Sequence, residues 1–399
     1  MKSKASGILF NLSIIGFFGI FTTTMSKNPV LPYLVKSLGA SDQILGLIAF
    51  ISPFAGILFS FPVGVLADRI GKKALLIFSA SVFVTAPLLY LLVSNVWFLI
   101  PVRFFHGMAT ATLSPIASAI IAGAFDKNKA EKLGTYSSIT LIGRTLAPLA
   151  GGFIIAFFAG HGELFSYRAV YVAAFLVSLP ILVAVFFVKT DDAAVKKSLS
   201  MGAFLTSLRE ILHSRAILAT ALIDLAIYFA FGIFETFSPG YFKSIGFGPR
   251  IVGLIFSIQI ISIALTKPFF GKLADKIDKR YQIAGGLVAI AGSIGALPFL
   301  TSLPVIIAVS LLFGLGMSFS TVATCAYVAE VAKDEHLGAS MGALSSIMDV
   351  GHSTGPLLGG CAIAVFGTAG SFLTGGAVAM VVVFLFSAVA FTRTRKAAH

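Results

Sequence analysis

Hydrophobic residues occur along this chain in runs of about twenty or more, separated by short polar segments. An α-helix rises about 1.5 Å per residue, so about 20 apolar residues span the roughly 30 Å hydrocarbon core of a bilayer. The alternating segments of about ten residues that are typical of a transmembrane β-barrel do not occur. The pattern predicts an all-α polytopic membrane protein with twelve helices, near residues 8–35, 43–66, 74–94, 96–123, 134–159, 169–188, 216–241, 250–270, 281–300, 304–331, 338–366 and 371–391.

Composition supports this class. Of 399 residues, 57% are hydrophobic and 11% charged, with a mean hydropathy of +0.99, whereas soluble domains carry about 25% charged residues. The apolar run after "MKSKASG" is too long for the hydrophobic region of a signal peptide, so we expect an uncleaved first helix. Cys325 and Cys361 fall inside predicted helices, where helix packing is expected rather than a disulfide or metal site.

The basic residues predict the orientation. If both termini are cytoplasmic, 21 of the 29 basic residues lie on the inner side. The outer loops then hold only Lys36, Arg168, Lys243 and Arg250. Because cytoplasmic loops of membrane proteins carry an excess of Lys and Arg, this bias predicts a cell inner-membrane protein with both termini inside. The net charge of +13 is thereby explained without nucleic acid.

The longest polar segment is a basic linker at 189–215, between predicted helices six and seven. Within it, "MGAFLTSLREIL" places apolar residues at helical spacing, which predicts an amphipathic helix on the inner membrane surface. A helix that binds a regulatory partner is the alternative. The apolar face consists of Phe204, Leu205, Leu208, Ile211 and Leu212.

Three stretches repeat at a nearly constant offset. "GVLADRIGKK" at 64–73 matches "GKLADKIDKR" at 271–280, and "LPYLVKSLG" at 31–39 matches "SPGYFKSIG" at 238–246, both at an offset of 207. "GRTLAPLAGG" at 143–152 matches "GHSTGPLLGG" at 351–360 at an offset of 208. The chain is therefore interpreted as a tandem duplication, with six-helix halves at 1–188 and 216–399. In transporters built from two such halves, the substrate site lies at their interface near the bilayer midplane.

These motifs resemble the major facilitator superfamily over essentially the whole chain. "GVLADRIGKK" is similar at every specified position to that superfamily's signature between helices 2 and 3, G-x-x-x-D-R-x-G-[RK]-[RK], through Gly64, Asp68, Arg69, Gly71, Lys72 and Lys73. "GRTLAPLAGG" resembles the helix 5 motif of the twelve-span drug:proton antiporters through Gly143, Pro148, Gly151 and Gly152, with Ala147 replacing one glycine. "RFFHG" resembles the helix 4 motif through Arg103 and Gly107, with His106 where that family often has glutamine. The resemblance implies the major facilitator fold.

Elementary chemistry agrees with these motifs. Gly64 and Gly71 permit a tight turn and close helix approach, and Asp68 can accept from a helix N-terminus or from Arg69, which predicts a cytoplasmic latch. Asp275 is the corresponding acid of the second copy. A solvated basic loop is the alternative. In the helix 5 motif and its copy, with Gly355 and Pro356, glycines allow close packing and prolines kink the helix.

Ionisable residues at predicted membrane depth are functional candidates, because a charge there costs about 2.5–3.5 kcal/mol on insertion scales. The first half contributes basic groups and the second half mostly acids. Lys267 is expected to extend to the inner interface. Structural pairing or a hydrogen-bonded core role is the alternative for each. The candidates for substrate binding and proton coupling are Lys27, Arg103, His106, Arg144, Asp224, Glu235, Asp349 and His352.

Four of these positions suggest pairs. Applying the offset of 207 to Lys27 gives Phe234, one residue before Glu235. We therefore hypothesise that Lys27 and Glu235 pair when the outer gate is closed and part when it opens. Asp349 and His352 are three residues apart and share a helix face.

The predicted function is secondary active transport by alternating access, with proton-coupled export of a small amphipathic or charged organic compound. Basic groups at depth in the first half favour an anionic or zwitterionic substrate. The proton gradient supplies the energy without a cofactor, and the expected partners are substrate, protons and membrane lipids, with no nucleic acid, in a monomer. A proton-coupled importer or a facilitator of a polar nutrient is the alternative. A membrane-embedded enzyme is a distant one, because the sequence has no H-E-x-x-H and no Cys/His ligand cluster, and no catalytic or metal residues are assigned.

Overall fold

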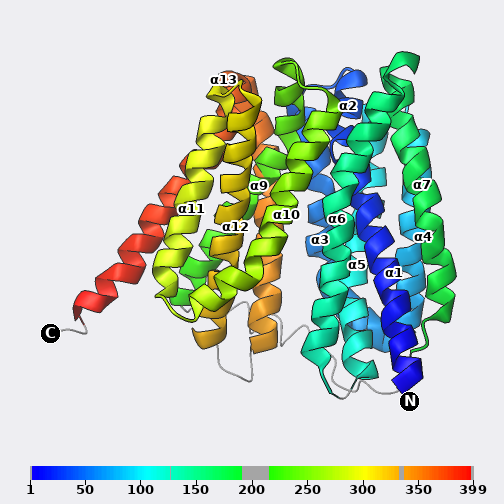
Figure 1. Cartoon of the computed structure of the whole chain (residues 1–399), viewed down its shortest axis with the longest axis horizontal. Coiled ribbons are helices and arrows are strands. Elements are labelled where there is room, and N and C mark those ends of the chain that lie inside the picture. Colours follow the sequence, from blue (N-terminus) through cyan, green and yellow to red (C-terminus); the bar gives the residue numbers. More distant parts are fainter. Residues whose placement is uncertain (1, 126, 191–214, 332–336, 397–399) are drawn as a thin grey trace. The chain divides into compact units, whose positions relative to one another are not determined.

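A computed structural model describes residues 2–125, 127–190, 215–331 and 337–396, and the regular elements in these ranges are all helical (Figure 1). The first helices of the chain are α1 (Lys2–Lys27), α2 (Val30–Ser37), α3 (Asp42–Ile70), α4 (Lys72–Leu91), η1 (Val96–Phe98), α5 (Leu99–Ala124), α6 (Lys129–Phe157), η2 (Ala159–His161) and α7 (Glu163–Phe187). The others are α9 (Arg215–Ser244), α10 (Pro249–Ala274), α11 (Lys279–Ala296), η4 (Leu297–Phe299), α12 (Leu303–Val331) and α13 (Leu337–Lys396). The predicted linker helix lies outside the described residues.

The helices form two compact units. Unit 1 comprises Met1–Ser41, Ile51–Leu199 and Phe242–Ser257, and unit 2 comprises Asp42–Phe50, Ser200–Tyr241 and Ile258–His399. The first nine residues of α3 thus pack with unit 2, whereas the end of α9 and the start of α10 pack with unit 1. The contacts described below each lie within one unit.

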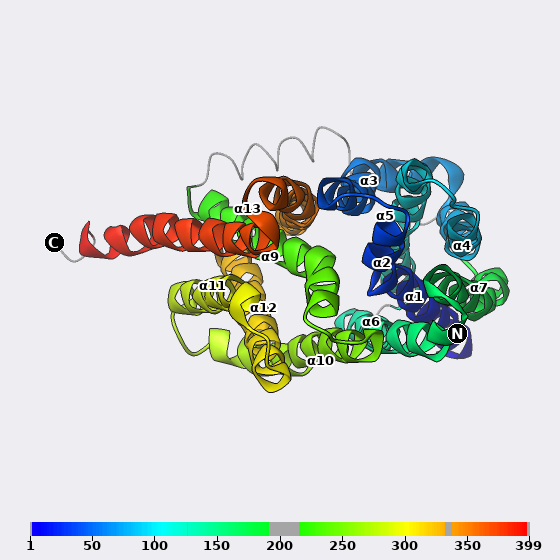
Figure 2. The ribbon, with the colours of Figure 1, turned by 90° about the horizontal axis from the view of Figure 1, so that it is seen from above.

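Unit 1 is built on α1, which packs along α6 and α7, while α4 packs on α5 and α7 (Figures 1 and 2). Its core is aliphatic and aromatic, with Leu12, Leu76, Phe83 and Ile116 almost completely buried. In unit 2, α11 packs against α12 and α13. A helix satisfies its own backbone hydrogen bonds, which is why helices can cross hydrocarbon.

Eleven helical segments are long and apolar enough to cross a membrane, among the described residues. The last of them, Leu344–Ala388, has 45 residues and covers most of the last two predicted helices. At about 1.5 Å per residue it is more than twice as long as a bilayer core requires. Gly367, with φ 70° and ψ −176°, interrupts its helical backbone, and the two parts of α13 run in different directions in Figures 1 and 2.

Large apolar side chains remain exposed on the helix surfaces. Phe157, Leu265, Val365 and Phe384 are 68–74% exposed. Such surfaces suit a lipid environment, in which apolar groups have no water to avoid. The chain is therefore a multi-pass membrane protein.

Two local features differ from, or refine, the sequence prediction. Arg168, which was assigned to an outer loop, lies inside α7, because that helix begins at Glu163, after Gly162 with φ 98°. An acidic residue in the first turn favours this early start. The predicted first helix is divided at Asn28 and Pro29, where α1 ends and α2 begins.

Candidate functional site

The helix 5 motif packs α6 against the start of α10 in unit 1. Gly152 has no room for a Cβ atom, which would meet the Pro249 carbonyl oxygen, and Gly253 in turn lies against the Pro148 carbonyl oxygen. The two helices therefore exchange glycine-to-carbonyl contacts on either side of their crossing. Only glycine permits so close an approach of two backbones.

The copy of this motif makes the same contacts in unit 2. Gly46 lies against the Pro356 carbonyl oxygen, and a Cβ at Gly360 would lie 2.8 Å from the Asp42 carbonyl oxygen. Each of the four residues is 207 or 208 positions from its counterpart in the α6–α10 contact. The two crossings therefore make equivalent contacts, with the spacing that the sequence repeat has.

A second pair of contacts fixes the offset between α1 and α9. Gly143 packs on the Phe17 carbonyl and Gly351 on the Leu225 carbonyl, an offset of 208 on both sides. Gly151 contacts Met25 and Pro29, while Gly359 contacts Ile233 and Phe237, again separated by 208.

With this offset, the equivalents of two predicted site residues change. Lys27 corresponds to Glu235 itself rather than to Phe234, and Arg144 corresponds to His352. The same two places thus carry two basic residues in one copy and an acid with a histidine in the other.

Glu235 and His352 form a direct polar contact in unit 2. His352 Nε2 lies 2.8 Å from Glu235 Oε2, and the two side chains are only 21% and 10% exposed. The aromatic rings of Tyr228 and Phe231 lie 6.3 and 5.5 Å from the imidazole. An imidazole beside a carboxylate in a largely dry setting can hold or release one proton, so this pair has the chemistry of a proton-coupled site.

Asp224 lies on α9 and is completely buried on the side of that helix that faces α12. Its Oδ1 lies 2.9 Å from the Thr324 hydroxyl oxygen, within hydrogen-bond distance, and Thr324 is also fully buried. Asp349, predicted to belong to the same group, is half-buried on α13. Asp224 and Glu235 both lie on α9, and Asp349 and His352 both lie on α13, in agreement with the predicted helices at 216–241 and 338–366.

In unit 1, the predicted basic residues occupy different surroundings. Lys27 is half-buried in the last turn of α1, and Arg144 is exposed on α6. Lys27 and Glu235 belong to different compact units, and their pairing stays a prediction.

Arg103 and His106 lie in the dry core of unit 1, 2% and 1% exposed. His106 Nε2 is 2.9 Å from the Thr23 hydroxyl, and the Tyr90 ring packs edge-on to the imidazole. Tyr90 stacks on Tyr171 with ring centroids 4.6 Å apart. The Arg103 guanidinium acts electrostatically on the rings of Tyr90, His106 and Tyr171. This arrangement ties α1, α4, α5 and α7 together.

The loop motif between α3 and α4 is described in part. Gly64 and Asp68 lie in α3, but the position of the Asp68 side chain is outside the described set. Arg69 is exposed, Gly71 has φ 87° between the two helices, and Lys72 is buried. Such a positive φ favours glycine.

Lys73, the last residue of that motif, binds the C-terminal end of α7. Its ammonium donates to the carbonyl oxygens of Val185, Phe186 at 3.3 Å and Val188 at 2.6 Å. A cation is favourable there because the last carbonyls of a helix have no intrahelical partners. The motif thus anchors the helix that precedes the basic linker.

In the second copy of the loop, Asp275 is exposed and two ion pairs form. Lys279 Nζ lies 2.6 Å from Glu330 Oε1, and the Arg280 guanidinium binds the Asp278 carboxylate at 2.5–3.0 Å. Asp278 also caps α11 by accepting from the Arg280 backbone N–H at 2.9 Å. The hydrogen bonds from Arg280 lower the pKa of Asp278 below its ordinary value.

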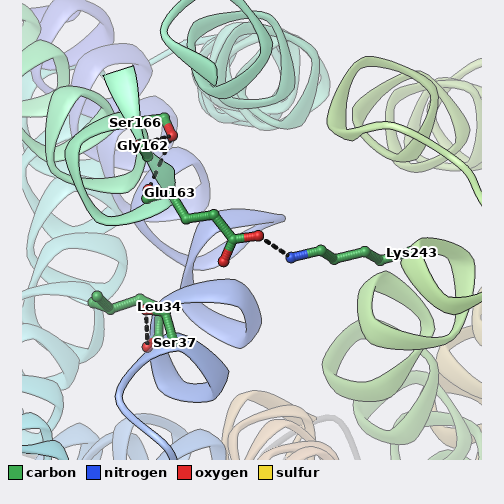
Figure 3. A network of polar contacts seen from close by, with 6 residues as sticks. All are labelled: Leu34, Ser37, Gly162, Glu163, Ser166 and Lys243. Atoms are coloured by element: carbon green, nitrogen blue, oxygen red, sulfur yellow. Dashed lines mark hydrogen bonds and ion pairs between the residues drawn. The ribbon is translucent and has the colours of Figure 1, made fainter. Parts of the chain in front are cut away.

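The sequence did not reveal a further contact, between α7 and the end of α9. Lys243 Nζ lies 2.7 Å from Glu163 Oε1 (Figure 3). The same ammonium lies over the Tyr33 ring, 5.6 Å from its centroid. Tyr33 is itself buried against Tyr167. The opposite charges of Glu163 and Lys243, both at predicted outer ends of helices, were the only sequence signal for this contact. Among the described residues, no group of three or more His, Cys, Asp or Glu could hold a metal ion.

Comparisons with known proteins give a consistent result. A family model described as Major Facilitator Superfamily matches residues 12–250 and 225–399. The chain is 25% identical to an uncharacterized MFS-type transporter of Methanocaldococcus jannaschii over 360 residues, covering 88% of this chain and 91% of that protein. It is also 25% identical to the multidrug resistance protein MdtG of Escherichia coli over 378 residues, covering 90% of each.

Solved structures share the fold. The nucleoside transporter NupG (D323A mutant) superposes with a TM-score of 0.82 at 14% identity, covering 96% of this chain and 99% of that one. A bacterial homologue of the human lysosomal transporter Spinster, in an inward-facing and unoccupied conformation, gives a TM-score of 0.77 at 17% identity, covering 98% and 96%.

Proposed function

The chain belongs to the major facilitator superfamily of membrane transporters, as its motifs predicted, and from this premise we propose that it is a proton-coupled exporter. It works by alternating access and moves a small amphipathic or charged organic compound out of the cell in exchange for protons. Similarity to the multidrug resistance protein MdtG supports the export direction.

In this proposal the protein is a monomer in the cell inner membrane, crosses it twelve times and keeps both termini in the cytoplasm. The two parts of α13 on either side of Gly367 supply the last two crossings. The first six crossings (1–188) and the last six (216–399) are the two moving halves, joined by the linker at 189–215. The basic residues at the predicted inner ends support this orientation.

The observation that carries the mechanism is the repeated glycine contact of α6 with α10 and of α3 with α13. Each joins a helix of one half to a helix of the other, at the end predicted to face outward. Two equivalent, tightly packed crossings without large side chains can separate together, as a rocking motion requires. We assign both crossings and the Glu163–Lys243 ion pair to the closed outer gate.

Proton coupling is assigned to the buried acids and histidines of the second half, with Arg103 as a positive group in the first. Glu235 and His352 already share a hydrogen bond, so protonation changes the charge of the pair without a large movement. Substrate and proton binding then alternate at Arg103, Asp224, Glu235, Asp349 and His352.

The equivalence of Lys27 and Arg144 with Glu235 and His352 bears on the substrate. One copy presents positive groups where the other presents an acid with an imidazole. A zwitterion has groups for both, so a zwitterionic or anionic amphipathic compound is favoured. The second candidate, a proton-coupled importer or a facilitator of a polar nutrient, receives support from the structural likeness to the nucleoside transporter NupG.

Reconstituted vesicles with an imposed pH gradient test the proposal. Four probes cover the charge classes: ethidium (cation), norfloxacin (zwitterion), fluorescein (anion) and uridine (neutral nucleoside). Export by antiport predicts that transport of norfloxacin or fluorescein moves protons in the opposite direction, which a pH dye reports. Proton movement in the same direction as the probe identifies an importer, and uridine transport without proton movement identifies a facilitator.

The predicted gate pair has its own test. Lys27→Glu and Glu235→Lys each place like charges together if the two residues meet, and the double variant restores opposite charges. Transport by the double variant is expected to exceed that of either single variant. If the double variant transports no better than either single variant, the two residues do not pair. His352→Gln changes the contact of Glu235 with the histidine and leaves Lys27 in place, so it separates that contact from the proposed pairing with Lys27.

A further inference from the structure

Asp224 is the most deeply buried acid in the described part of the chain, with 0% of its surface exposed. Its Oδ1 is bonded to the Thr324 hydroxyl, but its Oδ2 is buried and has no hydrogen-bond partner among the described residues. An ionised carboxylate in such a setting is costly unless its oxygens are paired. A neutral carboxylic acid is far less costly to bury there.

The hydrogen bonds around Thr324 distinguish the two forms. Thr324 has one hydroxyl proton and two acceptors within reach, Asp224 Oδ1 at 2.9 Å and the Thr321 carbonyl at 3.0 Å. If Asp224 is ionised, the single proton serves only one acceptor at a time. If Asp224 is protonated on Oδ1, it donates to Thr324, and Thr324 donates to the Thr321 carbonyl, so both short distances are hydrogen bonds.

Packing alone does not require this acid. At the offset of 208 that relates α1 to α9, the residue equivalent to Asp224 is Gly16. Gly107 lies against the Ser52 carbonyl as Gly314 lies against the Gln259 carbonyl, which sets an offset of 207 for α5 and α12. The equivalent of Thr324 is therefore Ala117.

The first copy thus forms the same part of the fold with Gly16 and Ala117, which have no polar side-chain atoms. The acid and the hydroxyl occur together in the second copy alone. This difference points to a function for the pair that helix packing does not explain.

The charged and titratable groups around Asp224 are few. On α12, Cys325 follows Thr324 and lies within electrostatic reach of Asp224, and Lys267 of α10 acts on the same thiol. On α13, the titratable residue at this level is Asp349, two positions before Gly351, which packs on the Leu225 carbonyl. Within the described set, Thr324 is therefore the direct partner of the carboxyl group.

We infer that Asp224 binds the exchanged proton in the conformation seen here, and that Thr324 switches its hydroxyl between Asp224 and the Thr321 carbonyl as the proton leaves and returns. The inference rests on the proposed proton coupling and deepens it. A proton from water forms an O–H bond at Asp224 Oδ1, the Thr324 hydroxyl turns to the carbonyl, and release reverses both changes. The Glu235–His352 pair is then left to meet the substrate.

Infrared spectroscopy of the full-length protein in lipid measures the proton directly, without a substrate. We expect the C=O stretching band of a buried, protonated carboxyl group at neutral pH, lost in Asp224→Asn and kept in Glu235→Gln and Asp349→Asn. Thr324→Val should shift the band, because it removes the hydroxyl that accepts from the acid. Thr321→Val is the matched control, since the relay uses only the carbonyl of Thr321. An unchanged spectrum in Asp224→Asn overturns the inference.

Vesicle transport then tests coupling. Asp224→Asn keeps an N–H that can donate to Thr324 and so imitates the protonated acid. For the probe that the unmodified protein accumulates under a pH gradient, the variant should lose that accumulation and retain exchange at equal pH. Glu131→Gln, an exposed acid on α6, controls for reconstitution. If Asp224→Asn still accumulates the probe, Asp224 does not carry the exchanged proton. If the unmodified protein accumulates no probe, the proposed function fails, while the infrared band still decides whether Asp224 holds a proton.

Discussion

Replacing Gly360 with alanine tests the close crossing of α13 and the first turn of α3. A Cβ atom there would lie 2.8 Å from the Asp42 carbonyl oxygen and 3.1 Å from the Gln43 Cα. Ordinary contact begins near 3.4 Å, so the helices must separate by about 0.6 Å. Overpacking costs about 1–3 kcal/mol, and the higher helix propensity of alanine offsets up to about 1 kcal/mol. The contact is expected to lose roughly 1–2 kcal/mol.

Hydrogen–deuterium exchange of the purified protein in lipid measures this loss. If the segment Asp42–Phe50 is held by α13, its opening free energy falls by the same amount, and its amides exchange roughly 5–30-fold faster. The equivalent variant Gly152→Ala should accelerate exchange at the start of α10. Gly292→Ala on α11 and Gly134→Ala on α6 add the same methyl group to open space and are the matched controls.

Unchanged exchange in Asp42–Phe50 of Gly360→Ala would refute the reasoning. So would equal acceleration in Gly292→Ala, because the effect would then come from the methyl group anywhere in the fold. An effect in Gly360→Ala without one in Gly152→Ala would show that the two copies of the crossing are not energetically equivalent.

Three further predictions follow from charged contacts. A double-mutant cycle of Glu163→Gln and Lys243→Met should give at most about 1 kcal/mol of coupling, decreasing with salt, since both side chains are more than half exposed; coupling well above this in thermal unfolding would contradict a surface pair. Lys73→Met should cost about 1–2 kcal/mol by leaving the last carbonyls of α7 without a cation, and an unchanged unfolding temperature would show that the contact contributes nothing. Asp278→Ala should cost about 1 kcal/mol at neutral pH through loss of the cap. Because Arg280 lowers the pKa of Asp278, this stabilisation is present above the ordinary carboxyl pKa of 3.8 and is lost as pH falls through the lowered value. Asp278→Asn should keep the cap and show no such loss of stability with pH.

Much of the fold could be predicted because its causes are local. Runs of apolar residues set the helices, and the motif copies at 143–152 and 351–360 contain the glycines that make equivalent contacts. Residues 8–35 were predicted as one helix, although Pro29 is a signal for the division at Asn28 and Pro29, since proline interrupts a helix. Helix ends were less certain: Arg168 lies within α7 because Gly162 and Glu163 start that helix earlier than hydropathy indicates.

The candidate site was harder to predict because its partners are far apart in sequence. His352 meets Glu235 across 117 residues, and only the packing of α13 on α9 decides this pairing. A usable signal did exist. Gly351, Gly355 and Gly359 are spaced by four, which marks one helix face for close packing, and His352 lies beside that face. No comparable pattern marked Glu163 and Lys243, whose contact depends on how two helix ends are placed.

The duplication also separates what the scaffold needs from what the chemistry needs. Where two copies share a contact, as at Gly152 and Gly360, the residue type is explained by backbone approach. Where equivalent places differ, as Lys27 differs from Glu235, packing cannot be the reason, because both residues occupy the same position in the same kind of helix crossing. We therefore propose that the residues for substrate and proton specificity are among the unequal positions. By this criterion Asp224, which replaces a glycine, ranks with Glu235 and His352. Arg103 and His106 lie deep in the core of unit 1 and hold four helices together. Whether they have a further role requires a separate test.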